Sequence, residues 1–229
     1  MKILILAAAN REIGDIINKL EFIHQIDSNF KSYKLGNLSV DILVSGYGSV
    51  FTAYYLTRAI NMINYDLVIN VGLAGSFDHF LEQGFIVNVV QDQFADLGIE
   101  HKNNFYSLFE EELMNENEFP FTEAKLNSLG NFEIEEVESL IPVKAVTVNT
   151  FHSDPKWINL MRVKYSPEIE TMNGAAFFYV CISEKVPFLQ IRAISHFVEI
   201  RRVENWNIPV AIKNLSSSVM SILDELRVE

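Results

Sequence analysis

The sequence predicts an α/β protein with a twisted, mostly parallel central sheet. Apolar runs of strand length alternate along the chain with longer segments of helical period. These strand-like runs are continuously apolar, which is typical of parallel strands that helices cover on both faces. Polar or Gly-rich sequence follows the strand ends, where α/β folds bind their ligands. Because 49% of the 229 residues are hydrophobic and no Pro- or Ser-rich linker interrupts them, residues 1–229 are predicted to form one domain.

The elements of the N-terminal half follow from apolar periodicity and from capping residues. Strands are predicted at residues 3–9, 40–44, 67–71 and 85–90. A helix follows the first strand, because Glu12 and a set of apolar residues recur at helical spacing as far as Leu20. Ser49 is a suitable N-cap for a second helix over residues 49–61.

The C-terminal half continues this alternation after an acidic interruption. Strands are predicted at residues 143–148 and 188–194, and helices over about 173–183 and from near Pro209 onward. Asp154-Pro155 predicts a further helix start, since a capping residue followed by Pro is typical of a first turn. Residues 103–140 hold ten Glu and one Lys, and they are predicted to be a variable, solvated excursion with room for a helix at 107–115.

Charge and cysteine content argue against several classes of function. The chain has 30 acidic and 18 basic residues, and a net charge of −12 is unfavourable for binding nucleic acid or an anionic membrane. The single cysteine, Cys181, excludes an intramolecular disulfide, and its apolar surroundings indicate a buried, inert thiol. The apolar opening resembles a strand more than a signal peptide, and no run is long enough to span a membrane. We therefore expect a soluble, cytoplasmic protein.

Two Gly-rich segments follow predicted strands, Gly46-Tyr47-Gly48 and Gly72-Leu73-Ala74-Gly75-Ser76. They do not form a dinucleotide-binding fingerprint, because Phe51 occupies the third glycine position of the first and the second lacks the Gly-x-Gly start. Their glycines either admit a ligand to the backbone or only turn the chain. The histidines lack metal-ligand spacing and no Walker or serine-hydrolase motif is present, so neither a metal nor a cofactor is predicted.

Four residues near strand ends have both a structural and a functional interpretation. Glu12 is favourable at the start of a helix for electrostatic reasons alone. His196 follows a predicted strand end, where catalytic acids often lie, but a lone histidine is more often structural or exposed. Composition alone assigns Phe151 and Met172 to the core. Taken by themselves, these residues indicate an α/β enzyme with a small-molecule site.

The order and spacing of several motifs resemble the purine nucleoside phosphorylase and nucleosidase superfamily. The matching segments are Glu170-Thr171-Met172-Asn173-Gly174-Ala175-Ala176, Val186-Pro187-Phe188, Ile191-Arg192-Ala193-Ile194-Ser195, residues 68–76, residues 8–12 and Val148-Asn149-Thr150-Phe151. Two further stretches are similar to futalosine hydrolases of the menaquinone pathway. These are Phe94-Ala95-Asp96-Leu97-Gly98, and Val198-Glu199-Ile200-Arg201-Arg202 with Trp206.

This resemblance implies a three-layer α/β/α sandwich that cleaves an N-glycosidic bond through an oxocarbenium-like transition state. Glu12 would activate the attacking water, Met172 would lie against the ribose and Phe151 against the purine. Gly75, Ser76 and Asn173 complete the implied substrate site. The resemblance also implies a small nucleoside substrate, no cofactor, and a homo-oligomer, a dimer or higher.

Two positions depart from the family pattern. Asn173 replaces a ribose-binding Glu, and His196 replaces an aspartate that many nucleosidases place after the serine. The loss of that aspartate argues against adenine-type nucleosidase activity and favours a hypoxanthine-bearing substrate. Histidine can still donate a hydrogen bond to the leaving purine, as a neutral tautomer or as a cation.

Three functions are compared on these grounds. The favoured one is hydrolysis of futalosine to hypoxanthine and dehypoxanthinyl futalosine, with Arg201 or Arg202 binding the substrate carboxylate unless both are solvated surface residues. The alternative is another purine nucleosidase, of the methylthioadenosine/adenosylhomocysteine type, or a purine nucleoside phosphorylase. A phosphorylase needs cations for phosphate, and of these only Arg192, Arg201 and Arg202 lie near the site motifs. The third is a catalytically silent nucleoside-binding protein.

Overall fold

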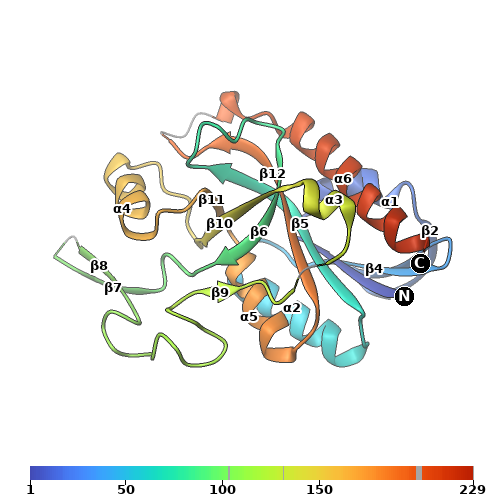
Figure 1. The fold of residues 1–229 in the computed structure, drawn as a ribbon, viewed down its shortest axis with the longest axis horizontal. Helices are drawn as coiled ribbons and strands as arrows, with labels where there is room; N and C mark the ends of the chain where they lie inside the picture. Colours follow the sequence, from blue (N-terminus) through green and yellow to red (C-terminus); the bar gives the residue numbers. More distant parts are fainter. Residues whose placement is uncertain (103, 131, 200–202, 229) are drawn as a thin grey trace.

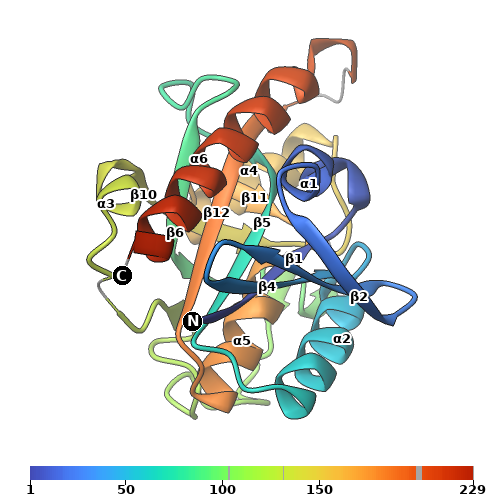
Figure 2. The ribbon, with the colours of Figure 1, turned by 90° about the vertical axis from the view of Figure 1, so that its right-hand side faces the viewer.

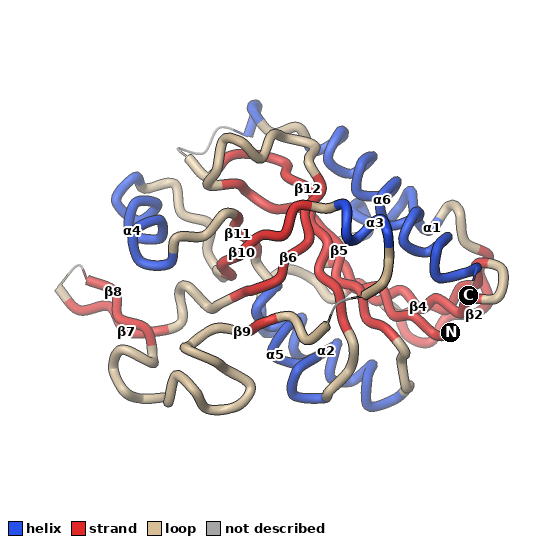
Figure 3. The backbone as a smooth tube through the Cα atoms, in the orientation of Figure 1, coloured by secondary structure: helices blue, strands red, loops and turns tan. Residues whose placement is uncertain are grey.

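A mixed sheet of ten strands forms the centre of the structure, and helices cover both of its faces (Figure 1 and Figure 3). The computed structural model describes residues 1–102, 104–130, 132–199 and 203–228. The strands are β1 (Lys2–Ala7), β2 (Glu21–Asp27), β3 (Phe30–Leu35), β4 (Leu38–Val44), β5 (Leu67–Ser76), β6 (Ile86–Asp92), β7 (Gly98–His101), β8 (Asn104–Ser107), β9 (Leu126–Asn127), β10 (Ile141–Thr147), β11 (Ile169–Thr171) and β12 (Phe188–Phe197). The helices are α1 (Asn10–Ile17), α2 (Ser49–Met62), α3 (Glu135–Ser139), α4 (Pro155–Tyr165), α5 (Gly174–Glu184), α6 (Ile208–Val228) and a 3-10 turn, η1 (Val203–Asn205).

Successive residues of the central strands pack into different cores, which explains their continuously apolar sequence. Ile3 and Ile5 of β1 pack with α1 and α6, whereas Leu4 and Leu6 pack with α2 and α5. The two-residue period of a strand thus places one set of side chains on each face of the sheet. Figure 2 shows α1 and α6 together on one side of the strands, and α2 and α5 together on the other. The predicted three-layer α/β class is confirmed.

The strand order is β11-β10-β6-β12-β5-β1-β4-β3-β2, with β9 beside β6. Parallel pairing joins β4, β1, β5 and β12, and antiparallel pairing adds β3 and β2 at one edge. At the other end β11 pairs with β5 as well as with β10, so that β5, β12, β6, β10 and β11 form a closed circuit. This closure brings residues that are distant in sequence, on β5, β11 and β12, next to one another.

The structure differs from the sequence predictions in several places, and the short elements α3, β7, β8, β9 and β11 are additions to the predicted set. Residues 107–115 are not helical, because Ser107 ends β8 and then bonds reciprocally with Glu110 in a turn. The hairpin of β2 and β3 was not predicted, because β2 is largely exposed and lacks an apolar pattern. Strands β5 and β12 extend beyond their predicted ends, so that the Gly-rich segment at 72–76 and His196 lie within strands instead of loops.

The C-terminal helix α6 covers the sheet as its apolar spacing predicts. Leu215, Val219, Ile222 and Leu223 are fully buried against the strands. Although α6 is the longest helix given above, no helix in the described part of the chain combines the length and apolar character needed to cross a membrane.

Candidate active site

Glu12 lies in the first turn of α1, just beyond the carboxyl end of β1. Its side chain is only 5% exposed and accepts two backbone hydrogen bonds, from Ala9 N to Oε2 at 2.9 Å and from Leu73 N to Oε1 at 3.2 Å. The first bond caps α1, and the second joins the helix to β5. Burial raises the pKa of Glu12 above its ordinary value, and Arg192 partly offsets this effect. The carboxylate is therefore fixed in position and more basic than an exposed one.

Arg192, on β12, lies beside Glu12, and the sequence had pointed to it only as a possible cation for phosphate. It is 2% exposed, and its Nη2 donates a 2.6 Å hydrogen bond to Oδ1 of Asn173. A methyl group at Gly72 would collide with the Arg192 guanidinium and lie 3.1 Å from Oε1 of Glu12, so glycine is required between them. The sequence does indicate a role for Arg192, because a charged residue in the middle of an apolar strand is rarely buried without a partner.

Asn173, between β11 and α5, faces Glu12 and Arg192 and has a free amide nitrogen, Nδ2. Its Oδ1 is occupied by Arg192, whereas its Nδ2 is buried and has no hydrogen-bond partner among the described residues. A buried unpaired amide is costly in a closed protein and is satisfied when a ligand oxygen reaches it. Asn173 therefore offers a donor to a ligand hydroxyl beside Glu12.

A second group of side chains, predominantly aromatic, lines a narrow pocket near the end of β12. Phe151, His152, Glu170, His196, Phe197, Val198, Glu199 and Trp206 line it. His196 stacks on Trp206 with ring centroids 3.9 Å apart, and its Nδ1 lies 2.9 Å from the Ser195 hydroxyl. Phe151 meets the His196 ring edge to face at 6.2 Å. The predicted Phe151 and His196 thus lie in one pocket, whose walls are mainly aromatic rings.

Asp96, in the segment 94–98 that sequence analysis singled out, holds the loop that carries Phe151. Its carboxylate accepts hydrogen bonds from Asn149 N at 2.5 Å and Thr150 N at 3.3 Å. The Asn149 side chain then accepts a 3.2 Å bond from Ser49 N at the start of α2. Asp96 is therefore a positioning residue for the Phe151 loop.

The other predicted site residues are placed as follows. Gly75 lies against His196, because a methyl group there would be 2.7 Å from His196 Nε2. The Ser76 hydroxyl donates to Asp78 O and Glu168 O, so it is used by the fold. Met172 is half-buried between β11 and α5. Arg201 and Arg202 lie outside the described residues.

A buried polar cluster lies beneath the site, at the N-terminus of α5. Asp92 accepts bonds from Thr147 Oγ1 at 2.9 Å and from Gln190 Nε2 at 3.1 Å, and burial raises its pKa to about 6. Gly174 fits against it, since a methyl group there would collide with Asp92 Oδ2. Asp92 also attracts the Arg192 guanidinium, so that Arg192 faces one carboxyl group in the site and one in the core.

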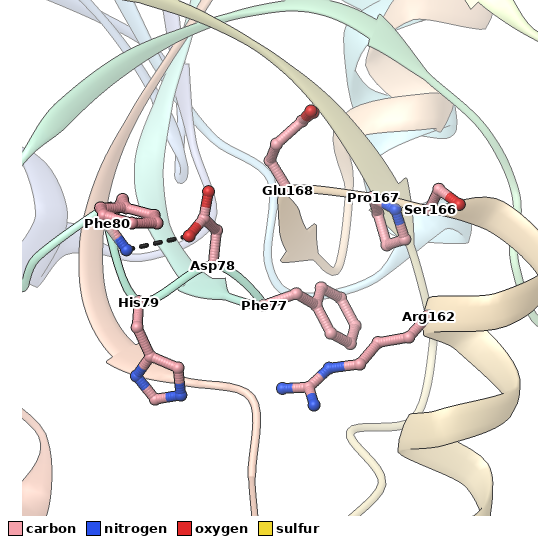
Figure 4. A pocket seen from close by; sticks show the side chains of 8 residues that line it. All are labelled: Phe77, Asp78, His79, Phe80, Arg162, Ser166, Pro167 and Glu168. Atoms are coloured by element: carbon pink, nitrogen blue, oxygen red, sulfur yellow. Dashed lines mark hydrogen bonds between the residues drawn. The ribbon is translucent and has the colours of Figure 1, made fainter.

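A larger hollow, of about 590 Å³, lies between the turn after β5 and the start of β11 (Figure 4). Arg162 extends across it beneath Phe77, with its guanidinium 5.8 Å from the ring centroid. None of the sequence-predicted site residues lines this hollow. The Glu12 and His196 region is the candidate active site, because ionisable, aromatic and unpaired polar groups converge there. Within the described ranges, no three His, Cys, Asp or Glu side chains are grouped to hold a metal ion.

The chain matches a known protein family and several curated proteins. Residues 2–224 match the model of the Phosphorylase superfamily. The chain is 28% identical over 204 residues to the 5′-methylthioadenosine/S-adenosylhomocysteine nucleosidase of Bacillus subtilis (strain 168), covering 85% of each chain. It is 26% identical over 237 residues to the protein of the same name from Psychromonas ingrahamii, covering 99% of this chain and 100% of that one.

Solved structures with the same fold include proteins of two named activities. The futalosine hydrolase of Helicobacter pylori strain 26695 superposes with a TM-score of 0.83 at 17% identity, covering 98% of both chains. The 5′-methylthioadenosine/S-adenosylhomocysteine nucleosidase of Colwellia psychrerythraea 34H, in complex with adenine, gives 0.81 at 22% identity, covering 99% of this chain and 96% of that one. At such identities the likeness establishes the fold.

Proposed function

Since the chain belongs to the Phosphorylase superfamily, we propose that it is a nucleosidase, which hydrolyses the N-glycosidic bond of a purine nucleoside. The observation that carries this proposal is the buried Glu12 carboxylate, fixed by two backbone amides at the end of β1. A fixed carboxylate of raised pKa can accept a proton from water as the water attacks the sugar. The aromatic pocket at Phe151 and His196 would receive the base, and Asn173 a sugar hydroxyl.

Water suits this site better than phosphate as the nucleophile. Arg192 already faces the carboxyl groups of Glu12 and Asp92 and donates to Asn173. An incoming phosphate dianion would be repelled by Glu12 and would have to compete for a cation that is already engaged. These charges support a hydrolase over a phosphorylase.

For the substrate we put 5′-methylthioadenosine and S-adenosylhomocysteine first. The curated relatives described above carry that name, so they favour the alternative of the sequence analysis over its first choice, futalosine. Futalosine remains the second candidate, supported by segments 94–98 and 198–202 and by His196 in place of an aspartate. The name of the Helicobacter pylori structure agrees with this second candidate.

The substrate is tested by incubating the pure chain with methylthioadenosine, S-adenosylhomocysteine, futalosine and inosine, with and without phosphate. We expect the free base and a free sugar at a rate that phosphate does not change. Chromatography of the base and of the sugar separates the outcomes. A sugar 1-phosphate would identify a phosphorylase, and binding without turnover of any nucleoside would identify a silent binding protein.

We also propose that the chain forms a homo-oligomer through the start of α2. Val50, Phe51 and Tyr54 are 75%, 55% and 61% exposed, and their spacing places them close together on the helix. Tyr47, just before the helix, is 46% exposed and extends the same apolar patch. Exposed apolar clusters of this kind are typical of protein interfaces. The patch lies beside the site, because Ser49 N bonds to Asn149.

A charge placed in this patch should separate the protomers. We expect Tyr54→Glu to reduce a dimeric or higher mass to that of one chain, measured by light scattering after size exclusion. Val163→Glu, at an exposed apolar position on α4, is the matched control and should leave the mass unchanged. A wild-type chain that is monomeric at micromolar concentration would contradict the proposal.

A further inference from the structure

Glu170 is a buried carboxyl group in the aromatic pocket, and the proposed function has given it no role so far. It lies in the middle of β11, is 3% exposed, and lines the pocket together with Phe151 and His196. Among the described residues, none forms a hydrogen bond with its carboxyl group. Carboxyl groups are rarely buried without partners, so this one is available to a ligand.

The closed circuit of strands places Glu170 and His196 on either side of Gly75. Glu170 pairs with Gly75 across β11 and β5, and Gly75 pairs with His196 across β5 and β12. Two strand spacings of about 4.8 Å separate their backbones, a distance of roughly 10 Å. Gly75 has no side chain of its own, and the side chains of His196 and Val198 occupy the space above it. Glu170 and His196 therefore line the same narrow pocket from two sides of Gly75.

The surroundings of Glu170 favour its protonated form near neutral pH. Burial, and secondarily the negative charge of Asp96, raise its pKa to about 8. The other ionisable groups that line the pocket are His152 from the loop after β10, His196 from β12, and Glu199 from the following turn. Below this pKa the carboxyl group is neutral and can donate a proton.

We propose that Glu170 is the general acid that protonates the departing purine, an inference that rests on the proposed nucleosidase function. As the C1′–N9 bond breaks, its electron pair passes to the purine, and Glu170 transfers its proton to a ring nitrogen. The oxygen of the attacking water bonds to C1′, and Glu12 accepts the proton that this water loses. The base leaves neutral with one added proton, and the proton on Glu12 returns to Glu170 through solvent before the next turnover.

This assignment supplies the acid that the sequence lacks at position 196. His196 occupies the place of the family's aspartate, which argued against adenine as the leaving base. A carboxyl group on β11, two strands away from His196 across Gly75, restores a proton donor to the same pocket. Adenine needs such a donor more than hypoxanthine does, so the inference agrees with methylthioadenosine and S-adenosylhomocysteine as substrates.

The test compares a leaving group that needs a proton with one that does not. Glu170→Gln keeps the size of the side chain and a hydrogen-bond donor but cannot transfer a proton. We expect it to lower kcat for the purine nucleoside about 100-fold. The phenolate of 4-nitrophenyl β-D-ribofuranoside leaves without protonation, so it does not need a general acid. The rate at which the variant cleaves this substrate should therefore differ from the wild-type rate by less than about twofold. The second substrate also reports that the variant is folded.

The wild-type pH profile gives a second test that needs no variant. With the purine nucleoside, kcat should fall as the pH rises through about 8, the pKa of Glu170. With the nitrophenyl riboside this alkaline fall should be absent. Glu168→Gln is the matched control, since its side-chain oxygen can still accept the bond from Lys144 N, and both activities should stay at the wild-type level.

The outcomes separate this inference from the proposed function. If wild-type protein cleaves the purine nucleoside and Glu170→Gln cleaves it equally well, Glu170 is not the acid. An equal loss on both substrates would make Glu170 structural, and a missing alkaline fall in the wild type would also overturn the assignment. If the wild type cleaves no purine nucleoside at all, the nucleosidase function itself fails.

Discussion

Glu12→Gln is expected to lower turnover by about 100-fold or more, because the amide cannot accept a proton from the attacking water. The Gln oxygen can still accept one of the two backbone hydrogen bonds that now reach Glu12, from Ala9 or Leu73. The fold and the affinity for the nucleoside should therefore be retained. Initial rates of base release, with a binding measurement on the same sample, check this expectation.

The pH dependence of wild-type activity tests the same role of Glu12 as a base. Glu12 acts as a base only when it is ionised, and burial raises its pKa above the ordinary 4.5. Activity should fall as the pH drops through this raised value. Glu21→Gln, at an exposed carboxylate at the start of β2, is the control and should match wild type. A Glu12→Gln variant with near wild-type turnover would remove Glu12 from the mechanism.

Arg192→Met is expected to cause the largest loss of stability. The substitution leaves Glu12 and Asp92 buried without the nearby positive charge, and it removes the charge-assisted hydrogen bond to Asn173, a kind of bond worth about 1.5–3 kcal/mol. It also frees Oδ1 of Asn173, so turnover should fall together with the free energy of unfolding. Urea denaturation followed by circular dichroism measures the change.

The size of this loss should depend on pH in a defined direction. The folded-state pKa values of Glu12 and Asp92 are already raised, and without Arg192 they rise further. A carboxyl group with a raised folded pKa binds more protons when folded, so its burial costs most above that pKa. The variant should therefore approach wild-type stability as the pH falls through about 6, the wild-type pKa of Asp92.

Arg58→Met provides the control for loss of a cation. Arg58 forms an exposed 2.8 Å ion pair with Asp27, and such pairs contribute little because solvent screens them. The free energy of unfolding of Arg58→Met should stay close to that of wild type at all pH values tested. If Arg192→Met were no less stable than Arg58→Met, the buried carboxyl groups would not depend on Arg192.

The sequence by itself determined the class of fold and several parts of the site. The continuous apolar runs at residues 3–9 and 188–194 require cover on both faces, because strand side chains alternate between them. The position of Glu12 just beyond a strand end was equally readable, since strand and helix periods are local properties of the chain. The helix predicted from local sequence at residues 107–115 was wrong, because a turn with reciprocal Ser107–Glu110 hydrogen bonds takes its place.

Only the tertiary structure decided which distant residues meet. The pairing of β11 with β5 closes a circuit of strands, and nothing in the local sequence of either strand specifies it. That closure places Glu170 across Gly75 from His196, and the pairing of β12 with β5 and β6 sets Arg192 near Glu12 and Asp92. The physical reason is that strand pairing and the burial of charge are non-local: the ionisation of Glu170 and Arg192 depends on neighbours that only the folded chain brings near.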